Sequence, residues 1–275
     1  MGKVISFMNN KGGVGKTTST HSIGLAFARM GKKILFIDLD SQANLTSMLS
    51  DTDPLKQEWE TTIEESFLQY PDIPLPIQKT SDPMVDFVPS DLDLANFEKD
   101  IARKSLREYL LADLLQPVVD KYDFIFIDCP PAIQMITYNA MLASDYLIFV
   151  STLDGKSFKG IQIITTVYND IIQNRRFASN VKILGILATK FERDKVSRIY
   201  WDLLNKQYGP LVIEPYIRKS TMVNRATSAN QSIYVIDPSG KVADDYIRAA
   251  EDILVRIDDD IRHANDEVEG QGSGE

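Results

Sequence analysis

The chain has 275 residues, 44% of them hydrophobic and 25% charged, which allows one large core or two small ones, and one compact α/β domain is the simplest prediction. Its formal net charge of −9, taken as a whole, argues against a nucleic-acid-binding surface, which needs positive charge. The single cysteine, Cys129, excludes an intramolecular disulfide and any cluster site that takes several thiolates from one chain, so a reducing cytoplasm is expected.

The chain is predicted to begin with a strand, loop and helix unit. Lys3 to Phe7 is a β-branched run, a glycine-rich string follows it, and Thr18 to Met30 has helical spacing that ends at Gly31. Lys33 to Ile37 is predicted to be a second strand, buried on both faces because its apolar run is unbroken. The apolar runs are far shorter than the about 20 residues of a membrane span, so no membrane partner is expected.

Residues 51–89 are predicted to form an irregular surface excursion. The prolines that interrupt this segment are Pro54, Pro71, Pro74, Pro76 and Pro83. Between them the pattern leaves room for a short helix near Thr61 to Leu68 and a strand at Val85 to Val88.

The remaining sequence alternates helices and strands. The predicted helices are Leu92 to Arg103, Leu106 to Val119, Ser197 to Gln207 and Ala243 to Ile257, and the predicted strands are Phe124 to Ile127, Tyr146 to Val150 and Ile183 to Ala188. This alternation predicts one α/β domain over residues 1–257, with a mostly parallel twisted sheet, right-handed crossovers and helices on both faces. Residues 258–275 hold seven acidic residues and one arginine, and we expect a disordered acidic tail there.

The glycine-rich string between the first strand and the first helix carries the strongest functional signal. It reads Lys11-Gly12-Gly13-Val14-Gly15-Lys16-Thr17-Thr18. Glycines let successive backbone N–H groups point inward, and the helix N-terminus adds a positive dipole, so Gly12 to Thr18 are predicted to cradle the phosphates of ATP. Lys16 is predicted to reach the β- and γ-phosphates, and the Thr17 hydroxyl is predicted to bind Mg²⁺.

The string departs from the common phosphate-loop pattern, because Asn10 stands where that pattern has glycine and Lys11 adds a second lysine. In these features the chain resembles the ParA/MinD family of deviant Walker A P-loop ATPases. The resemblance implies a P-loop NTPase fold and Mg-dependent hydrolysis of ATP to ADP and phosphate. In that family the first lysine, here Lys11, crosses the interface of a nucleotide-sandwich dimer and touches the partner's phosphates. An ATP-dependent homodimer is therefore expected, with Lys11 and Lys16 stabilising charge on the transferred phosphoryl group.

Three aspartates follow predicted strands, at the end where doubly wound sheets bind ligands. Asp38 and Asp40 close the second strand, and Asp128 closes the run from Tyr122 to Ile127 as a Walker B aspartate does. Ser41 stands where the family's D-x-D-P-Q-x-N motif has proline.

The resemblance, which extends to about Ala250, assigns roles to these carboxylates. It implies that Asp40 orients or deprotonates the attacking water, and that Asp38 and Asp128 lie at the metal with Thr17. Asp154 falls where relatives often have a glutamate near the partner's ribose, so it is expected to contact nucleotide.

A basic segment lies inside this acidic chain. Between Lys190 and Arg225 there are eight basic and four acidic residues, a local charge of about +4 that suits either a solvated helical face or a phosphate-binding surface. The stretch from Tyr246 to Asn265 contains three successive aspartates, which is the wrong sign for a MinD-like membrane helix.

The chain therefore resembles the short ParA/Soj type. This resemblance implies non-specific binding of double-stranded DNA, a ParB-like centromere-binding partner, segregation of plasmid or chromosomal DNA, and a cytoplasmic, nucleoid-associated location. The expected DNA contacts are Lys195, Arg198, Arg218, Lys219 and Arg225. Open alternatives are a MinD-like or other cargo-positioning ATPase without DNA binding, a small-molecule kinase or ligase of similar fold, and a non-catalytic nucleotide-binding adaptor.

Overall fold

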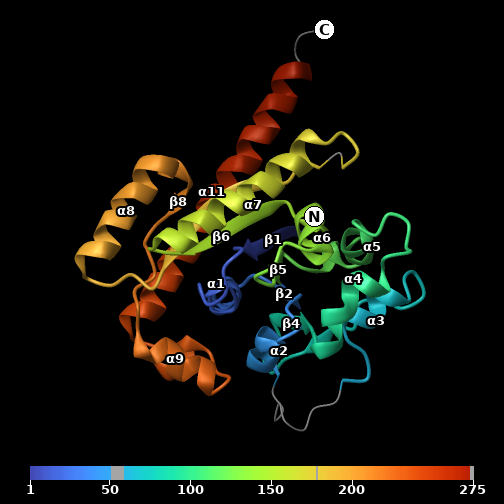
Figure 1. Ribbon diagram of the computed structural model, residues 1–275, viewed down its shortest axis with the longest axis horizontal. Coiled ribbons are helices and arrows are strands. Elements are labelled where there is room, and N and C mark those ends of the chain that lie inside the picture. The colour runs from blue at the N-terminus through green and yellow to red at the C-terminus, as the bar shows by residue number, and fades with distance from the viewer. Residues whose placement is uncertain (51–58, 178, 273–275) are drawn as a thin grey trace.

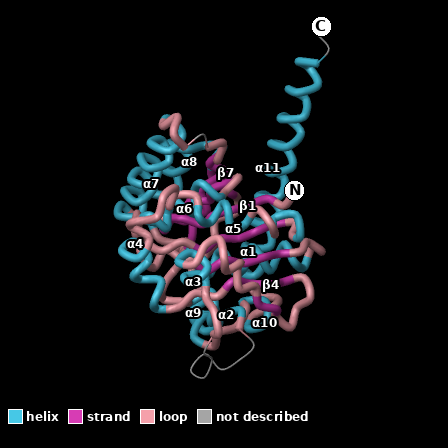
Figure 2. The backbone as a smooth tube through the Cα atoms, turned by 90° about the vertical axis from the view of Figure 1, so that its right-hand side faces the viewer, coloured by secondary structure: helices cyan, strands magenta, loops and turns pink. Residues whose placement is uncertain are grey.

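The computed structural model describes residues 1–50, 59–177 and 179–272. In this part of the chain, a twisted sheet lies between two layers of helices (Figure 1). Figure 2 shows α4, α6 and α7 on one side of the strands and α1 and α11 on the other. The predicted α/β fold class is confirmed.

The sheet has eight strands in the order β3-β4-β2-β5-β1-β6-β7-β8. The strands are β1 Lys3–Met8, β2 Ile34–Asp38, β3 Gln78–Lys79, β4 Val85–Val88, β5 Phe124–Asp128, β6 Tyr146–Thr152, β7 Lys182–Thr189 and β8 Val212–Ile213. Neighbouring strands pair in parallel, except that β3 pairs antiparallel with β4. The predicted mostly parallel sheet is confirmed. Its strands are buried because helices cover both faces of the sheet.

Two apolar cores follow from the alternation of side chains along each strand. Ile125 and Ile127 of β5 lie in one core, and Phe124 and Phe126 of the same strand lie in the other. The first core is covered by α3 Ile63–Leu68, α4 Phe97–Asp100, α5 Leu110–Leu115, α6 Met135–Ala143, α7 Gly155–Gln173 and α8 Lys195–Tyr208. The second is covered by α1 Lys16–Arg29, α2 Asn44–Leu49, α9 Thr221–Ser228, α10 Ile233–Ile236 and α11 Lys241–Gly272.

None of the helices in the described part of the chain combines the length and the apolar character needed to cross a bilayer.

The two helices predicted between residues 92 and 119 are shorter and broken in the structure. The first is a 3-10 turn, Leu92–Asn96, followed by the single turn α4. Of the second, only α5 and a 3-10 turn, Val119–Lys121, are helical. Leu106 has a φ of 52°, and a left-handed residue cannot continue a right-handed helix, so the predicted helix cannot begin there.

The helix and the strand predicted inside the surface excursion of residues 51–89 are both present. Residues 51–58 lie outside the described residues. Beyond them, the predicted helix is present as α3, and the predicted strand is β4, which pairs with β2 inside the sheet. Ile63 and Phe67 are fully buried in the first core, where Phe67 packs against Phe97 of α4. Between α3 and β4, where Pro71, Pro74, Pro76 and Pro83 lie, only Leu75 among residues 69–84 is buried, so this part of the segment lies at the surface.

The acidic segment from Asp258 also differs from the expected disordered tail, since α11 continues through it to Gly272. Asp260 ties this part of the helix to the sheet, accepting hydrogen bonds from Tyr146 and from Lys182. Asp259 accepts one from Arg262 one turn along. The C-terminal end of α11 then projects from the body of the molecule (Figures 1 and 2). Residues 273–275 of the predicted tail lie outside the described residues.

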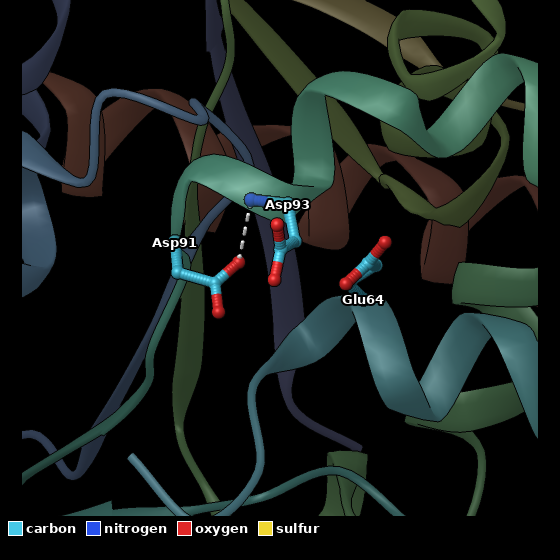
Figure 3. Close-up of side chains that lie close together, drawn as sticks. All are labelled: Glu64, Asp91 and Asp93. Carbon is cyan, nitrogen blue, oxygen red and sulfur yellow. Dashed lines mark hydrogen bonds between the residues drawn. The ribbon is translucent and has the colours of Figure 1, made fainter. Parts of the chain in front are cut away.

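Three carboxylates come together where α3 meets the 3-10 turn that follows β4 (Figure 3). Oxygens of Glu64, Asp91 and Asp93 all lie within 4.8 Å of one another, and the Asp93 N–H donates to Asp91 at 3.1 Å. Burial, followed by the negative charges of Asp91 and Asp93, raises the pKa of Glu64 from its ordinary 4.5 to about 7. Ionised Glu64 therefore destabilises the folded state.

We expect Glu64→Gln to stabilise the protein in a pH-dependent way. A carboxyl whose pKa is raised by folding contributes most below its unfolded pKa, and that contribution is lost as pH rises through about 7. The variant should therefore raise the thermal midpoint at pH 8 and do so much less at pH 5, as followed by circular dichroism. Glu65→Gln, which keeps an oxygen to accept from the Thr62 N–H, is the control and should give no such gain. Equal shifts of the Glu64→Gln protein at both pH values would contradict the assignment.

Candidate functional site

The glycine-rich loop connects the carboxyl end of β1 to the first turn of α1. Gly13 and Gly15 have φ values of 73° and 93°, in the left-handed region that side chains disfavour. These two glycines therefore let the loop curl back on itself. Gly15 is also the N-cap of α1 and provides no side-chain cap, so the first N–H groups of the helix are available to an anion.

Lys16 is the first residue of α1, and only 6% of it is exposed. Its ammonium donates to the Lys11 carbonyl at 3.3 Å. Burial lowers the pKa of Lys16, although the nearby charge of Asp128 acts in the opposite direction. The loop therefore presents a desolvated cation at its centre, and binding of phosphate oxygens would restore its lost solvation.

Asp38 and Asp128 are side by side because the two strands they end are neighbours in register. Both are fully buried, and burial raises the pKa of each carboxyl above its ordinary value. The negative charge of Asp38 raises the pKa of Asp128 further, and that of Asp40 adds to the rise at Asp38. Asp38 accepts hydrogen bonds from the backbone N–H and the hydroxyl of Thr46, each at 2.8 Å. One of the two acids is thus held in place by α2.

Asp128 has capacity left for a cation. Its Oδ1 accepts from Thr20 at 3.4 Å, while its buried Oδ2 has no hydrogen-bond partner among the described residues. A buried carboxylate oxygen without a donor, beside a second carboxylate and close to the Thr17 that follows Lys16, fits a hard divalent cation such as Mg²⁺.

Asp40 lies in the loop after β2 and lines the same cavity as Gly13, Lys16 and Thr17. Its carboxylate accepts from the Gln42 N–H at 3.0 Å, and its carbonyl accepts from Ser90 at 3.0 Å. The structure thus brings Asp38, Asp40 and Asp128 to one end of the sheet, as their positions after strands predict. This loop has Ser41 where the family motif has proline, and the Ser90 hydroxyl anchors it by donating to the Asp40 carbonyl.

Lys11 turns away from that cavity in this structure. Its ammonium contacts Asp154 at 2.7 Å, Ser157 at 3.0 Å and Thr152 at 3.2 Å. Burial acts to raise the pKa of Asp154, but hydrogen bonds from Lys11 and Thr152 hold it well below its usual range. Asp154 is the N-cap of α7, pairs with Lys11 and does not line the cavity of its own chain.

The cavity has a volume of about 1080 Å³, and its far side comes from residues that the sequence analysis did not assign to nucleotide. Those residues follow β7 and β8 or belong to α9 and α11, and include Phe191, Tyr216, Ile217, Asn224 and Tyr246. Phe191 and Tyr216 stack with ring centroids 3.9 Å apart. Phe191 and Tyr216 are brought together by tertiary contacts at the edge of the sheet. No local sequence motif predicts that these two segments meet.

The end of β7 also supports the phosphate loop directly. The Thr189 hydroxyl donates to the Val14 carbonyl at 2.6 Å, and the Lys190 ammonium donates to the Gly13 carbonyl at 2.7 Å. Lys190 was counted only as part of the basic segment. Its place after a buried strand, like that of Asp38 and Asp128, is a signal that could have marked it.

The five expected DNA contacts are in different settings. Lys195 and Arg198 on α8 and Arg225 on α9 are exposed, and both helices lie toward the β8 edge of the sheet (Figure 1). Lys219 pairs with Glu192 at 2.8 Å on the surface. The Arg218 guanidinium instead donates twice to the fully buried Asp245, at 2.6 Å each, so it does not face solvent as a free cation.

The comparisons with known proteins agree with this geometry. A family model described as an AAA domain matches residues 2–183. The virulence plasmid ParA family protein pGP5-D of Chlamydia psittaci is 31% identical over 256 residues, which cover 91% of this chain and 94% of that protein. The chain belongs to the ParA/MinD family of P-loop ATPases. The predicted family is thereby confirmed.

Two further proteins are similar to this chain over most of their length. The sporulation initiation inhibitor protein Soj of Bacillus subtilis (strain 168) is 29% identical over 255 residues, covering 92% of this chain and 98% of Soj. Cobyrinic acid a,c-diamide synthase from Mycobacterium smegmatis, solved with ADP and magnesium bound, superposes with a TM-score of 0.77 at 27% identity. That superposition covers 92% of this chain and 94% of the synthase chain.

We expect Lys16→Ala to abolish nucleotide binding by this ParA/MinD family protein. The change removes the buried cation on which the loop centres and leaves Asp128 and Asp38 without a nearby positive charge. Calorimetric titration with ATP and Mg²⁺ should show loss of the binding heat, while circular dichroism should still show a folded protein. Unchanged affinity would mean that phosphate binds elsewhere.

Proposed function

We propose that this protein is an Mg-dependent ATP hydrolase that works as a dimerising switch, binds DNA without sequence preference and segregates plasmid or chromosomal DNA with a ParB-like partner. The single observation behind the catalytic part is one cavity that gathers the phosphate loop, Lys16 and Asp40 beside buried Asp38 and Asp128. Family membership supports a ParA/MinD-type ATPase, and the ATP and DNA assignments build on it.

Thr17, Asp38 and Asp128 would hold Mg²⁺, which neutralises phosphate charge when it is bound. Lys16 stabilises negative charge on the β- and γ-phosphates, because its ammonium is desolvated and fixed at the start of α1. Asp40 is exposed to the cavity, where its carboxylate can orient a water molecule and accept its proton. In this proposal Lys16 and the metal ligands bind the nucleotide, while Asp40 is needed for its hydrolysis.

The dimer is proposed from Lys11. For this lysine to reach a partner's phosphates, its ammonium must leave Asp154, Ser157 and Thr152, with which it forms hydrogen bonds within its own chain. A triphosphate in the partner's site offers the compensating charge. Assembly and nucleotide state are coupled for that reason, and Asp154 becomes free to meet the partner's nucleotide in the same step.

The DNA part of the proposal is supported by the charge of about +4 between Lys190 and Arg225 and by the exposure of Lys195, Arg198 and Arg225. Two such segments placed side by side in a dimer would contact one duplex through its phosphates. A cytoplasmic, nucleoid-associated location would follow. The ParB-like partner rests on the likeness to ParA family and Soj proteins.

A synthase-like function is the second candidate, because the Mycobacterium smegmatis enzyme has the same fold at 27% identity. It would need a pocket for an acceptor substrate, and it would give Lys11 no task. A cargo-positioning ATPase would hydrolyse ATP without binding DNA, and an adaptor would bind nucleotide without turnover. DNA binding and turnover thus separate these alternatives.

We expect Asp40→Ala to bind ATP and dimerise but to hydrolyse at least about a hundredfold more slowly, since it removes water activation and leaves the phosphate cradle intact. Phosphate release and light scattering measure the two properties. Asp113→Ala, an exposed aspartate on α5, is the control and should behave as the unmodified protein. Normal turnover by Asp40→Ala would move the catalytic base to another group, with Asp38 the nearest.

We expect the doubly reversed variant Lys195→Glu with Arg198→Glu to lose ATP-dependent affinity for all DNA sequences alike. The dependence of log affinity on log salt should flatten by about one unit per lost phosphate contact. Fluorescence anisotropy on two unrelated duplexes, across a salt series, measures both. ATPase activity without DNA should be retained.

The control pair is Lys99→Glu with Arg103→Glu, two exposed basic residues in and just after α4, which lies across the molecule from α8 (Figure 1). It carries the same change in net charge and should leave DNA affinity and salt slope unaltered. Equal losses in both pairs would show that net charge alone is responsible. If the unmodified protein with ATP binds no DNA at low salt, the positioning ATPase becomes the better assignment.

A further inference from the structure

Arg218 and Asp245 form an ion pair between the segment after β8 and helix α11. The guanidinium donates through Nε to Oδ2 and through Nη2 to Oδ1, both at 2.6 Å, and the Arg218 backbone N–H also donates to Oδ2 at 3.1 Å. Asp245 is fully buried, while a third of the Arg218 side chain is exposed. A bidentate contact of this kind fixes the orientation of the guanidinium as well as its distance from the carboxylate.

The arginine end of the pair belongs to the wall of the nucleotide cavity. The Ile217 N–H donates to Ala188 at 2.8 Å, the Phe191 N–H donates to Ile217 at 3.0 Å, and the Lys219 N–H donates to Phe191 at 2.9 Å. These bonds extend the edge of the sheet beyond β7 and bring Tyr216 onto Phe191. These backbone bonds tie the wall to the sheet, while Arg218 ties it to the start of α11, one turn or more before the contacts that Asp252 and Arg256 make with residues 210–214.

The aspartate end is also next to a residue that lines the cavity. Tyr246, the next residue after Asp245, lines the cavity and shares a 3.4 Å hydrogen bond with Ser19 of α1. Because α1 starts at Lys16, the pair connects the wall of Tyr216 and Ile217 to the helix that carries the phosphate loop. The Arg218–Asp245 pair thereby links the glycine-rich loop to the part of the cavity lined by Tyr216 and Ile217, and so affects the distance between them.

We propose that Arg218 is a positioning residue for the nucleoside part of the bound nucleotide and not a DNA contact. This inference rests on the proposed nucleotide-binding function. The phosphates are held by Gly13 to Thr18, whose support from Thr189 and Lys190 does not involve the pair. The base and ribose occupy the remaining cavity, between the Tyr216 wall and Tyr246, and need that wall in place.

The test compares ADP with tripolyphosphate, both with Mg²⁺, because the second ligand has phosphates and no nucleoside. Arg218→Gln should weaken ADP binding about tenfold or more and change tripolyphosphate binding less than about twofold. Calorimetry measures the first, and competition against a fluorescent ADP analogue measures the second. Asp245→Asn should share the pattern.

The control is Arg256→Gln, which breaks another arginine contact between α11 and the β8 region. Arg256 donates to Asp252 at 2.8 Å and to the carbonyls of Pro210 and Val212, and it does not line the cavity. Both arginine variants should lower the thermal midpoint, but only Arg218→Gln should separate the two ligands. If Arg218→Gln fails to fold, Arg218→Lys, which keeps the charge without the fork, should show a smaller loss of the same kind.

Other outcomes overturn the inference. Equal weakening of both ligands, or the same pattern in Arg256→Gln, would reduce the pair to a general structural role. Unchanged ADP affinity with weakened DNA binding would return Arg218 to the DNA surface. Binding of ADP but not tripolyphosphate by the unmodified protein would show that the phosphate loop does not act independently. Binding of neither ligand would instead remove the proposed function itself.

Discussion

The in-register pairing of β2 with β5 is the constraint on which the site depends. It puts Asp38 and Asp128 on adjacent strand ends, where burial raises the pKa of both and the charge of Asp38 further opposes ionisation of Asp128. Two such carboxylates are costly unless positive charge is supplied. Lys16 and the first turn of α1 provide part of it, and a divalent cation would provide the rest. The fold thus builds a place that is more stable when magnesium and phosphate are present together.

Contacts from two different strands hold the glycine-rich loop. β1 leads into it, and β7, separated from β1 by β6, fixes its carbonyls through Thr189 and Lys190. Those contacts engage the Val14 and Gly13 carbonyls, and the N–H groups at the start of α1, which no side chain caps, remain as donors for an anion. Pre-arranged donors of this kind need no reorganisation when charge develops on a phosphoryl group.

Much of this could be predicted from local sequence, and the exceptions share a cause. Runs such as Phe124 to Ile127 specify buried strands, and polar residues placed directly after them mark the ligand end of the sheet. β3 and β8 have two residues each, too few for any period to appear. Arg218 counted as free positive charge because its partner, Asp245, lies 27 positions away and is fully buried. Likewise, the acidic segment after Asp258 looked too polar to fold, but Tyr146 and Lys182 give Asp260 its partners.

Helix α11 links the two ends of the strands. Near its start, Tyr246 meets Ser19 beside the cavity, and at Asp260 the same helix meets the first residues of β6 and β7. These two points are separated by about 21 Å at 1.5 Å per residue. Because one continuous helix makes both contacts, α11 braces the sheet from the end that carries the cavity to the end where β6 and β7 begin.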